Sequence, residues 1–86
     1  MDQQYFVYIL KSLRFNRFYI GQTNNIEHRL ERHNAGFVKS TKGFAPYKIV
    51  GYLIKETRSE AMILERKLKN LNTEDLEKFI HKYFAK

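Results

Sequence analysis

The stretches Tyr5-Phe6-Val7-Tyr8-Ile9-Leu10 and Phe18-Tyr19-Ile20-Gly21 decide the fold of this chain. Both are rich in the aromatic and β-branched residues that favour strands. The polar residues between them, around Asn16, predict a turn, so the two stretches are expected to pair as an antiparallel hairpin. Glycine weakens a strand interior, so Gly21 indicates a strand end or a close approach of the backbone.

A helix is predicted after the hairpin. Asn24 is a suitable N-cap, and Glu27 stands three residues later, which together form a capping-box pattern. Gly36 supplies the expected end of this helix. Residues 37–46 contain glycine and basic side chains and predict a loop.

The second half of the chain predicts one strand and two helices. Residues 47–54 are typical of a third strand, and residues 57–60 form a second capping box. Thr73 is expected to cap a last helix. The apolar stripes of the two helices are expected to hold Ala61, Leu64, Leu68 and Leu71, and then Leu76, Phe79, Ile80 and Tyr83. The order ββαβαα predicts an α+β domain with a small three-stranded sheet flanked by helices.

Composition narrows the class of protein. The 86 residues suffice for one domain, which is expected to span residues 1–86. The lack of cysteine excludes a disulfide framework and a cysteine-based zinc site. No apolar run approaches the roughly 20 residues of a membrane span, and residues 1–4 lack the features of a signal peptide. We therefore expect a cytoplasmic protein without a membrane partner.

The charge is strongly basic and unevenly placed. The net charge is +7, and residues 11–48 hold eight basic and two acidic side chains. Such an excess favours an anionic partner, with nucleic acid foremost, although a basic soluble protein without such a partner has the same composition.

Two tyrosines on the predicted hairpin are candidates for chemistry. Tyr8 and Tyr19 are eleven positions apart on paired strands, so they can lie close together on one face. A phenol can pass protons, but with an unperturbed pKa of about 10 it needs a nearby cation to act as a base. The alternative is that both are core or interface aromatics.

A polar row follows on the first predicted helix. Arg29 and His33 are an i, i+4 pair that can point at one anion, and Asn25 extends the same row. Arginine suits bidentate phosphate contact, and histidine can move a proton near neutral pH. The alternative is a solvated polar face with a partly buried histidine.

Glu65 is the candidate metal ligand. A lone carboxylate suits Mg²⁺, which keeps several waters and takes phosphate oxygens as further ligands. The alternative is an exposed ion pair between Glu65 and Lys69 at i, i+4.

None of these candidate residues is specific for one function by itself, but the order in which they occur along the chain is specific. Phe6-Val7-Tyr8, ten intervening residues and Tyr19-Ile20-Gly21 are followed by Arg29, His33 and a helical Glu65. This order resembles the GIY-YIG nuclease superfamily over nearly the whole chain. Residues 19–25, 33–36 and 58–61 look most like its small single-domain bacterial branch, the UPF0213 family.

The resemblance implies a three-stranded antiparallel sheet flanked by helices and an endonuclease that hydrolyses phosphodiester bonds in nucleic acid, with DNA expected. Tyr8 would activate a metal-bound water, directly or as a relay, and Tyr19 would lie beside it. Arg29 would neutralise the phosphate, and His33 would support the proton transfer or the phosphate. Glu65 would hold a single Mg²⁺ or Mn²⁺. Substrate contacts are implied at Gly21, Gln22, Thr23, Asn25, Lys39 and Lys42.

Two departures from the family pattern leave an alternative open. Gln22 stands where several family enzymes carry lysine, and Glu77 stands where some carry asparagine. The chain could therefore be a nucleic-acid-binding module that cuts very slowly or not at all.

A third alternative is a protein-interaction adaptor that exposes Phe79, Tyr83 and Phe84, although packing against the sheet is preferred for these residues. We expect a monomer or a weak oligomer. Repair, recombination and defence against foreign DNA fit the residues equally well.

Overall fold

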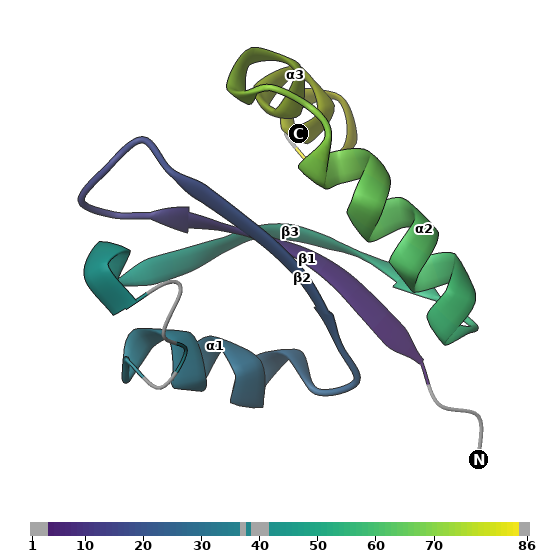
Figure 1. Cartoon of the computed structure of the whole chain (residues 1–86), viewed down its shortest axis with the longest axis horizontal. Coiled ribbons are helices and arrows are strands. Elements are labelled where there is room, and N and C mark those ends of the chain that lie inside the picture. The colour runs from purple at the N-terminus through teal and green to yellow at the C-terminus, as the bar shows by residue number, and fades with distance from the viewer. Residues whose placement is uncertain (1–3, 37, 39–41, 85–86) are drawn as a thin grey trace.

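The central strand of the sheet is β1 (Tyr5–Ser12). It pairs antiparallel with β2 (Phe18–Thr23) on one side and with β3 (Tyr47–Lys55) on the other (Figure 1). The structure is a computed structural model, and it describes residues 4–36, 38 and 42–84. The predicted antiparallel hairpin and three-stranded sheet are thus confirmed.

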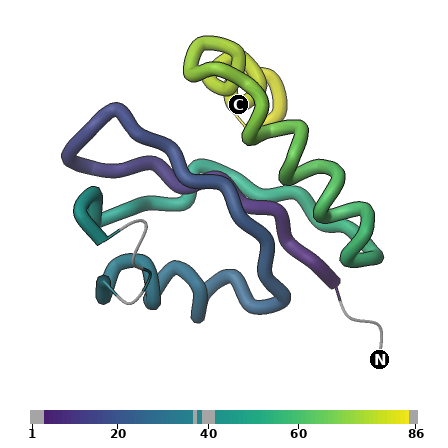
Figure 2. The backbone as a smooth tube through the Cα atoms, in the orientation of Figure 1, coloured from purple at the N-terminus to yellow at the C-terminus, as the bar shows by residue number. Residues whose placement is uncertain are grey.

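Three α-helices and one short 3₁₀ turn complete the described part of the chain. They are α1 (Ile26–Asn34), η1 (Lys42–Phe44), α2 (Arg58–Lys69) and α3 (Thr73–Phe84). The predicted order ββαβαα is confirmed, with η1 lying inside the predicted loop. The backbone trace places α1 on one face of the sheet and α2 with α3 on the other (Figure 2).

Burial on both faces explains the sequence of β1. Val7, Tyr8, Ile9 and Leu10 are all buried, and successive side chains of a strand point to opposite faces. Val7 and Ile9 join the cluster formed with α2 and α3, whereas Tyr8 and Leu10 join the cluster on the side of α1. A strand that is covered on both faces has a continuous run of apolar residues instead of alternating apolar and polar residues, and residues 7–10 form such a run.

The helix caps differ from the prediction at two of three positions. Asn25, not Asn24, caps α1, because its side chain accepts a hydrogen bond from the backbone N–H of His28. Asn72, not Thr73, caps α3 in the same way, accepting from the backbone N–H of Asp75. Asn and Thr are both good N-cap residues, so where two of them are adjacent the sequence does not show which one caps the helix. The path of the backbone decides it. Thr57 caps α2 as predicted.

The last helix packs through most of its predicted stripe. Leu76 is buried, and Phe79, Ile80 and Phe84 pack partly buried against the α2 side of the core. Tyr83 is 54% exposed, so its predicted place in the stripe is wrong. Packing against the sheet thus accounts for two of the three aromatic residues considered for an adaptor surface. None of the described helices has the length and the apolar composition of a membrane-spanning segment.

The ring of Phe84 lies against Gly51 of β3, where a β-carbon would collide with it. We expect Gly51→Ala to lower the free energy of unfolding by about 1–3 kcal/mol, as overpacking does in well-filled cores. Chemical denaturation measures the change, and the cost should shrink in a Phe84→Ala background.

Gly43→Ala is the matched control for this prediction. A β-carbon at Gly43 meets no described atom within 4 Å, so that substitution should not destabilise the protein. An equal cost of Gly51→Ala with and without the Phe84 ring would contradict the explanation.

Candidate active site

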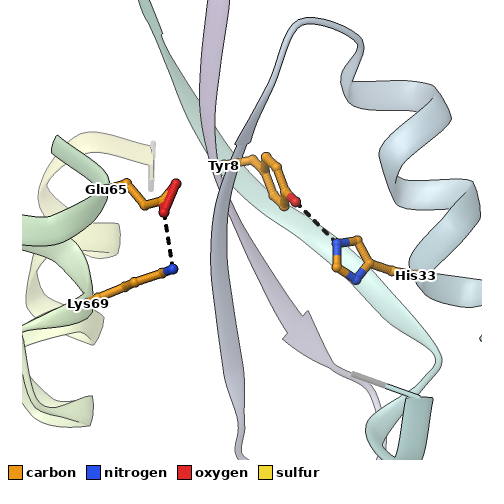
Figure 3. A network of polar contacts seen from close by, with 4 residues as sticks. All are labelled: Tyr8, His33, Glu65 and Lys69. Atoms are coloured by element: carbon orange, nitrogen blue, oxygen red, sulfur yellow. Dashed lines mark hydrogen bonds and ion pairs between the residues drawn. The ribbon is translucent and has the colours of Figure 1, made fainter. Parts of the chain in front are cut away.

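The tyrosine of the first motif and the histidine of α1 meet inside the protein. The hydroxyl of Tyr8 lies 3.1 Å from Nε2 of His33 (Figure 3). Tyr8 is 2% exposed and His33 is 0% exposed. A buried hydroxyl proton needs an acceptor, and the neutral imidazole nitrogen supplies one.

The end of α1 is tied to β3, which explains why His33 reaches the sheet. The side chain of Asn34 accepts a hydrogen bond from the backbone N–H of Tyr47 (2.6 Å) and donates one to its carbonyl (3.1 Å). This paired contact copies the hydrogen bonds of a neighbouring strand. It holds the last turn of α1 over the sheet, and His33 with it.

Aromatic rings surround the imidazole. The ring centroid of Tyr19 is 4.7 Å from that of His33, and the centroids of Tyr8 and Tyr47 are each 6.0 Å away. The rings of Tyr8 and Tyr19 are 6.3 Å apart, so the hairpin register brings the two motif tyrosines to one face as predicted. Both are also core aromatics, with Tyr8 buried and Tyr19 partly buried.

Gly21 is paired with Tyr8 across the hairpin, and its missing side chain makes room for the phenol. A β-carbon at Gly21 would lie 2.5 Å from the Tyr8 hydroxyl oxygen and 3.2 Å from a ring carbon of Tyr19. Any larger residue would displace the hydroxyl from His33. The structure therefore gives Gly21 a role in positioning Tyr8, whereas the family resemblance implied a contact with substrate.

Burial sets the charge state of the pair. Burial, helped by the positive charges of Arg29 and Arg32, lowers the pKa of His33 to about 4. Burial is also the main reason that the pKa of Tyr8 is raised; Tyr19 and Glu65 add to this effect, while Arg29 opposes it. Near neutral pH both groups are uncharged. In the His33 tautomer that carries its hydrogen on Nδ1, the Tyr8 hydroxyl donates the hydrogen bond and Nε2 accepts it.

Arg29 and the residues before α1 differ in their freedom to contact a ligand. Arg29 is partly buried, and its charge acts on both Tyr8 and His33, as an anion-binding group beside them would. Asn25 caps the helix, so its side-chain oxygen is already used. The Thr23 hydroxyl is likewise engaged, with the backbone N–H and carbonyl of Asn25.

Glu65 lies on the other side of the sheet. It projects from α2, whereas Tyr8 points toward α1, with strands of the sheet between them (Figure 3). An open hollow of about 310 Å³ is lined by Glu65, Gln22, Lys69 and three neighbours. One oxygen of Glu65 is 3.0 Å from Nζ of Lys69, so the ion pair considered as the alternative is present.

The donor set around Glu65 suits a hard divalent cation that also binds phosphate. The side-chain oxygen of Gln22 is buried and finds no hydrogen-bond partner among the described residues, which is costly unless a ligand satisfies it. That oxygen and the carboxylate of Glu65 are ligands that Mg²⁺ or Mn²⁺ accepts. The described residues hold no group of three acidic, histidine or cysteine side chains, so most ligands would be water and substrate.

The remaining candidates lie elsewhere. Lys42 is exposed at the start of η1, and Lys39 lies outside the described residues. Glu77 lines a different hollow, together with Lys11 and Lys48. Its departure from the family pattern therefore does not alter the surroundings of Glu65.

Sequence reasoning missed Tyr47 and Asn34. Tyr47 completes the aromatic wall around His33, and Asn34 attaches α1 to β3. They are thirteen positions apart in the sequence, across a loop, and no local pattern pairs residues at that distance. The available signals were an aromatic residue opening a strand and an asparagine at a helix end.

We predict that an NMR titration of the imidazole resonances of His33 gives a pKa near 4. Because the ordinary pKa is about 6.5, the unfolded chain takes up the proton first as the pH falls. Stability contributed by neutral His33 is therefore present above pH 6.5 and is lost between pH 6.5 and 4. His33→Gln should flatten this part of the stability curve. A pKa at or above 6.5 would contradict the burial argument.

Comparison with known proteins places the chain in a family. Residues 4–85 match the family model of the GIY-YIG catalytic domain. A UPF0213 protein of Oceanobacillus iheyensis is 42% identical over 72 residues, covering 83% of each chain. One of Clostridium perfringens is 40% identical over 67 residues, covering 77% of this chain and 71% of that protein. The solution NMR structure of the UPF0213 protein BH0048 from Bacillus halodurans matches with a TM-score of 0.64 at 26% identity, covering 95% of this chain and 87% of that one. The chain therefore belongs to the GIY-YIG catalytic domain family, within its UPF0213 group.

Proposed function

We propose that this protein is a divalent-metal-dependent endonuclease that hydrolyses phosphodiester bonds in nucleic acid, with DNA as the expected substrate. The observation that carries the proposal is the buried hydrogen bond between Tyr8 and His33. The positive charge of Arg29 lies near enough to lower the pKa of both groups. Family membership supports the reaction class, since the matching model describes a catalytic domain.

The pair can accept a proton from an attacking water. The raised pKa of Tyr8 means that its phenolate is not populated near neutral pH, so the phenol must lose a proton as it gains one. His33 is neutral and lies on that proton's path, at 3.1 Å. A proton can pass from water to the Tyr8 oxygen while the Tyr8 proton passes to Nε2.

The other candidate residues would bind the phosphate. Arg29 offers a planar set of donors that suits phosphate oxygens, and Tyr19 has a hydroxyl on the same face as Tyr8. Glu65 and Gln22 would hold the cation, which when bound neutralises phosphate charge and lowers the pKa of water. These roles agree with the family resemblance at every position except Gln22, where several family enzymes carry lysine.

Two features of the structure favour a second candidate, a nucleic-acid-binding module with little or no cutting. Tyr8 and His33 are shielded from solvent, and the carboxylate of Glu65 is engaged by Lys69. Cutting therefore requires that the Tyr8 hydroxyl becomes accessible and that Lys69 releases Glu65. Binding alone requires neither change.

Cleavage of labelled DNA distinguishes the two functions. Single strands, duplexes, flaps and four-way junctions are incubated with Mg²⁺, with Mn²⁺ or with chelator. We expect metal-dependent cutting, slowed about 10²–10⁴-fold by Tyr8→Phe, the range that general acid–base groups contribute. Glu65→Gln should reduce cutting to background in Mg²⁺ while DNA binding in chelator is retained.

Glu74→Gln is the matched control, because Glu74 forms the same i, i+4 ion pair with a lysine on α3. It should cut like the unchanged protein. If no DNA in the panel is cut in either metal while binding persists, the endonuclease is refuted and the binding module stands.

A further inference from the structure

The turn of the β1–β2 hairpin and the 3₁₀ turn η1 lie together at one end of the sheet (Figure 1). We call the side chains of Arg14, Phe15, Arg17, Lys42 and Phe44 the basic tip. The backbone N–H of Leu13, in the same hairpin turn, donates to the carbonyl of Pro46 at 2.9 Å, so the hairpin turn is joined to the segment that follows η1.

A single buried hydroxyl organises this tip. Ser12 is 3% exposed, and its Oγ donates to the carbonyl of Phe44 at 2.6 Å. The same oxygen accepts from the backbone N–H groups of Arg14 and Phe15, each at 3.1 Å. The two turns are thus held in one arrangement, which reduces the entropy cost of binding.

Two aromatic rings in contact with each other each carry an arginine on the tip. The guanidinium carbon of Arg17 lies 4.3 Å from the ring centroid of Phe44, and that of Arg14 lies 5.5 Å from the centroid of Phe15. The two rings meet edge to face at 5.5 Å. A stacked guanidinium keeps its N–H donors at its edge, where they can reach phosphates. Phe15 is 46% exposed, so part of its ring is open to a ligand.

The charge around the tip is of one sign. Residues 11–26 and 32–55 contain no aspartate or glutamate. The tip also adjoins the candidate active site, because Phe44 packs against the buried cluster of Tyr8, Leu10 and Tyr47, and the Tyr47 ring is 6.0 Å from that of His33. A polyanion held at the tip is thus placed to continue toward the active site.

We propose that the basic tip binds unpaired nucleotides, with a base stacked on Phe15 and phosphates contacted by Arg14, Arg17 and Lys42. This inference deepens the proposed function and rests on nucleic acid being the substrate. In a duplex the bases are stacked on one another and leave no face for Phe15, whereas an unpaired base offers its whole π-face. The tip therefore selects for single-stranded segments.

Fluorescence anisotropy in chelator tests the inference without cleavage. The probes are oligothymidylate, oligouridylate and a blunt DNA duplex. Phe15→Ala should weaken single-strand binding about tenfold, within the range measured for loss of one base stack, and leave duplex binding unchanged. Phe15→Tyr keeps the ring and should restore single-strand affinity. Arg14→Gln should weaken binding to all probes and lower the salt slope for single strands by about 0.7.

Leu13→Ala is the matched control, because Leu13 is 59% exposed in the same turn but carries no ring. It should change no affinity, and thermal unfolding checks that every variant is folded. Equal weakening of single-strand and duplex binding by Phe15→Ala would overturn the stacking site. These binding measurements are made in chelator and do not depend on whether the protein cuts DNA. The test of the basic tip is therefore separate from the test of the nuclease activity.

Discussion

The hydrogen bond between Tyr8 and His33 joins the central strand to the helix that covers one of its faces. It depends on three features set elsewhere. β1 must be buried on both sides, so that Tyr8 points toward α1 while Val7 and Ile9 point toward α2. Gly21 must leave room for the phenol, and Asn34 must attach the end of α1 to β3. Together these features hold two titratable groups in a site from which water is nearly excluded. Burial keeps both groups uncharged near neutral pH.

The sheet divides the candidate active site into two parts. The proposed proton-transfer residues lie under α1, and the candidate cation ligands, Glu65 and Gln22, lie beside α2. For the proposed cleavage, a phosphodiester group must reach both parts at once. In this conformation Tyr8 is shielded from solvent and Lys69 forms an ion pair with Glu65. Substrate phosphate would compete with Glu65 for Lys69. The carboxylate of Glu65 and the buried oxygen of Gln22 would then be the groups available to hold a cation. On the proposed function, substrate would bind first at the basic tip, and its phosphate would then bring the two parts of the site into use.

Much of the fold could be predicted from the residues, because its signals are local. The unbroken apolar run of β1, the glycine after α1 and the capping box at Thr57 each act within a few positions. The cap positions at Asn25 and Asn72 could not be predicted, since adjacent Asn and Thr residues are equivalent until the backbone path is known. For the site, strand pairing predicted that Tyr8 and Tyr19 share a face. Nothing local indicated that His33 would be completely buried, that Tyr47 would pack beside it, or that Glu65 would lie across the sheet, because these depend on contacts between distant segments.

The central claim is that Tyr8 and His33 act as one proton-accepting unit. The most direct test is a double-mutant cycle on the rate of metal-dependent DNA cleavage, using Tyr8→Phe, His33→Gln and the combined variant. Residues that act as a unit are strongly non-additive. The combined variant should therefore cut about as slowly as the slower single variant. Rate losses that multiply in the combined variant would show that the two residues act independently and would contradict the account.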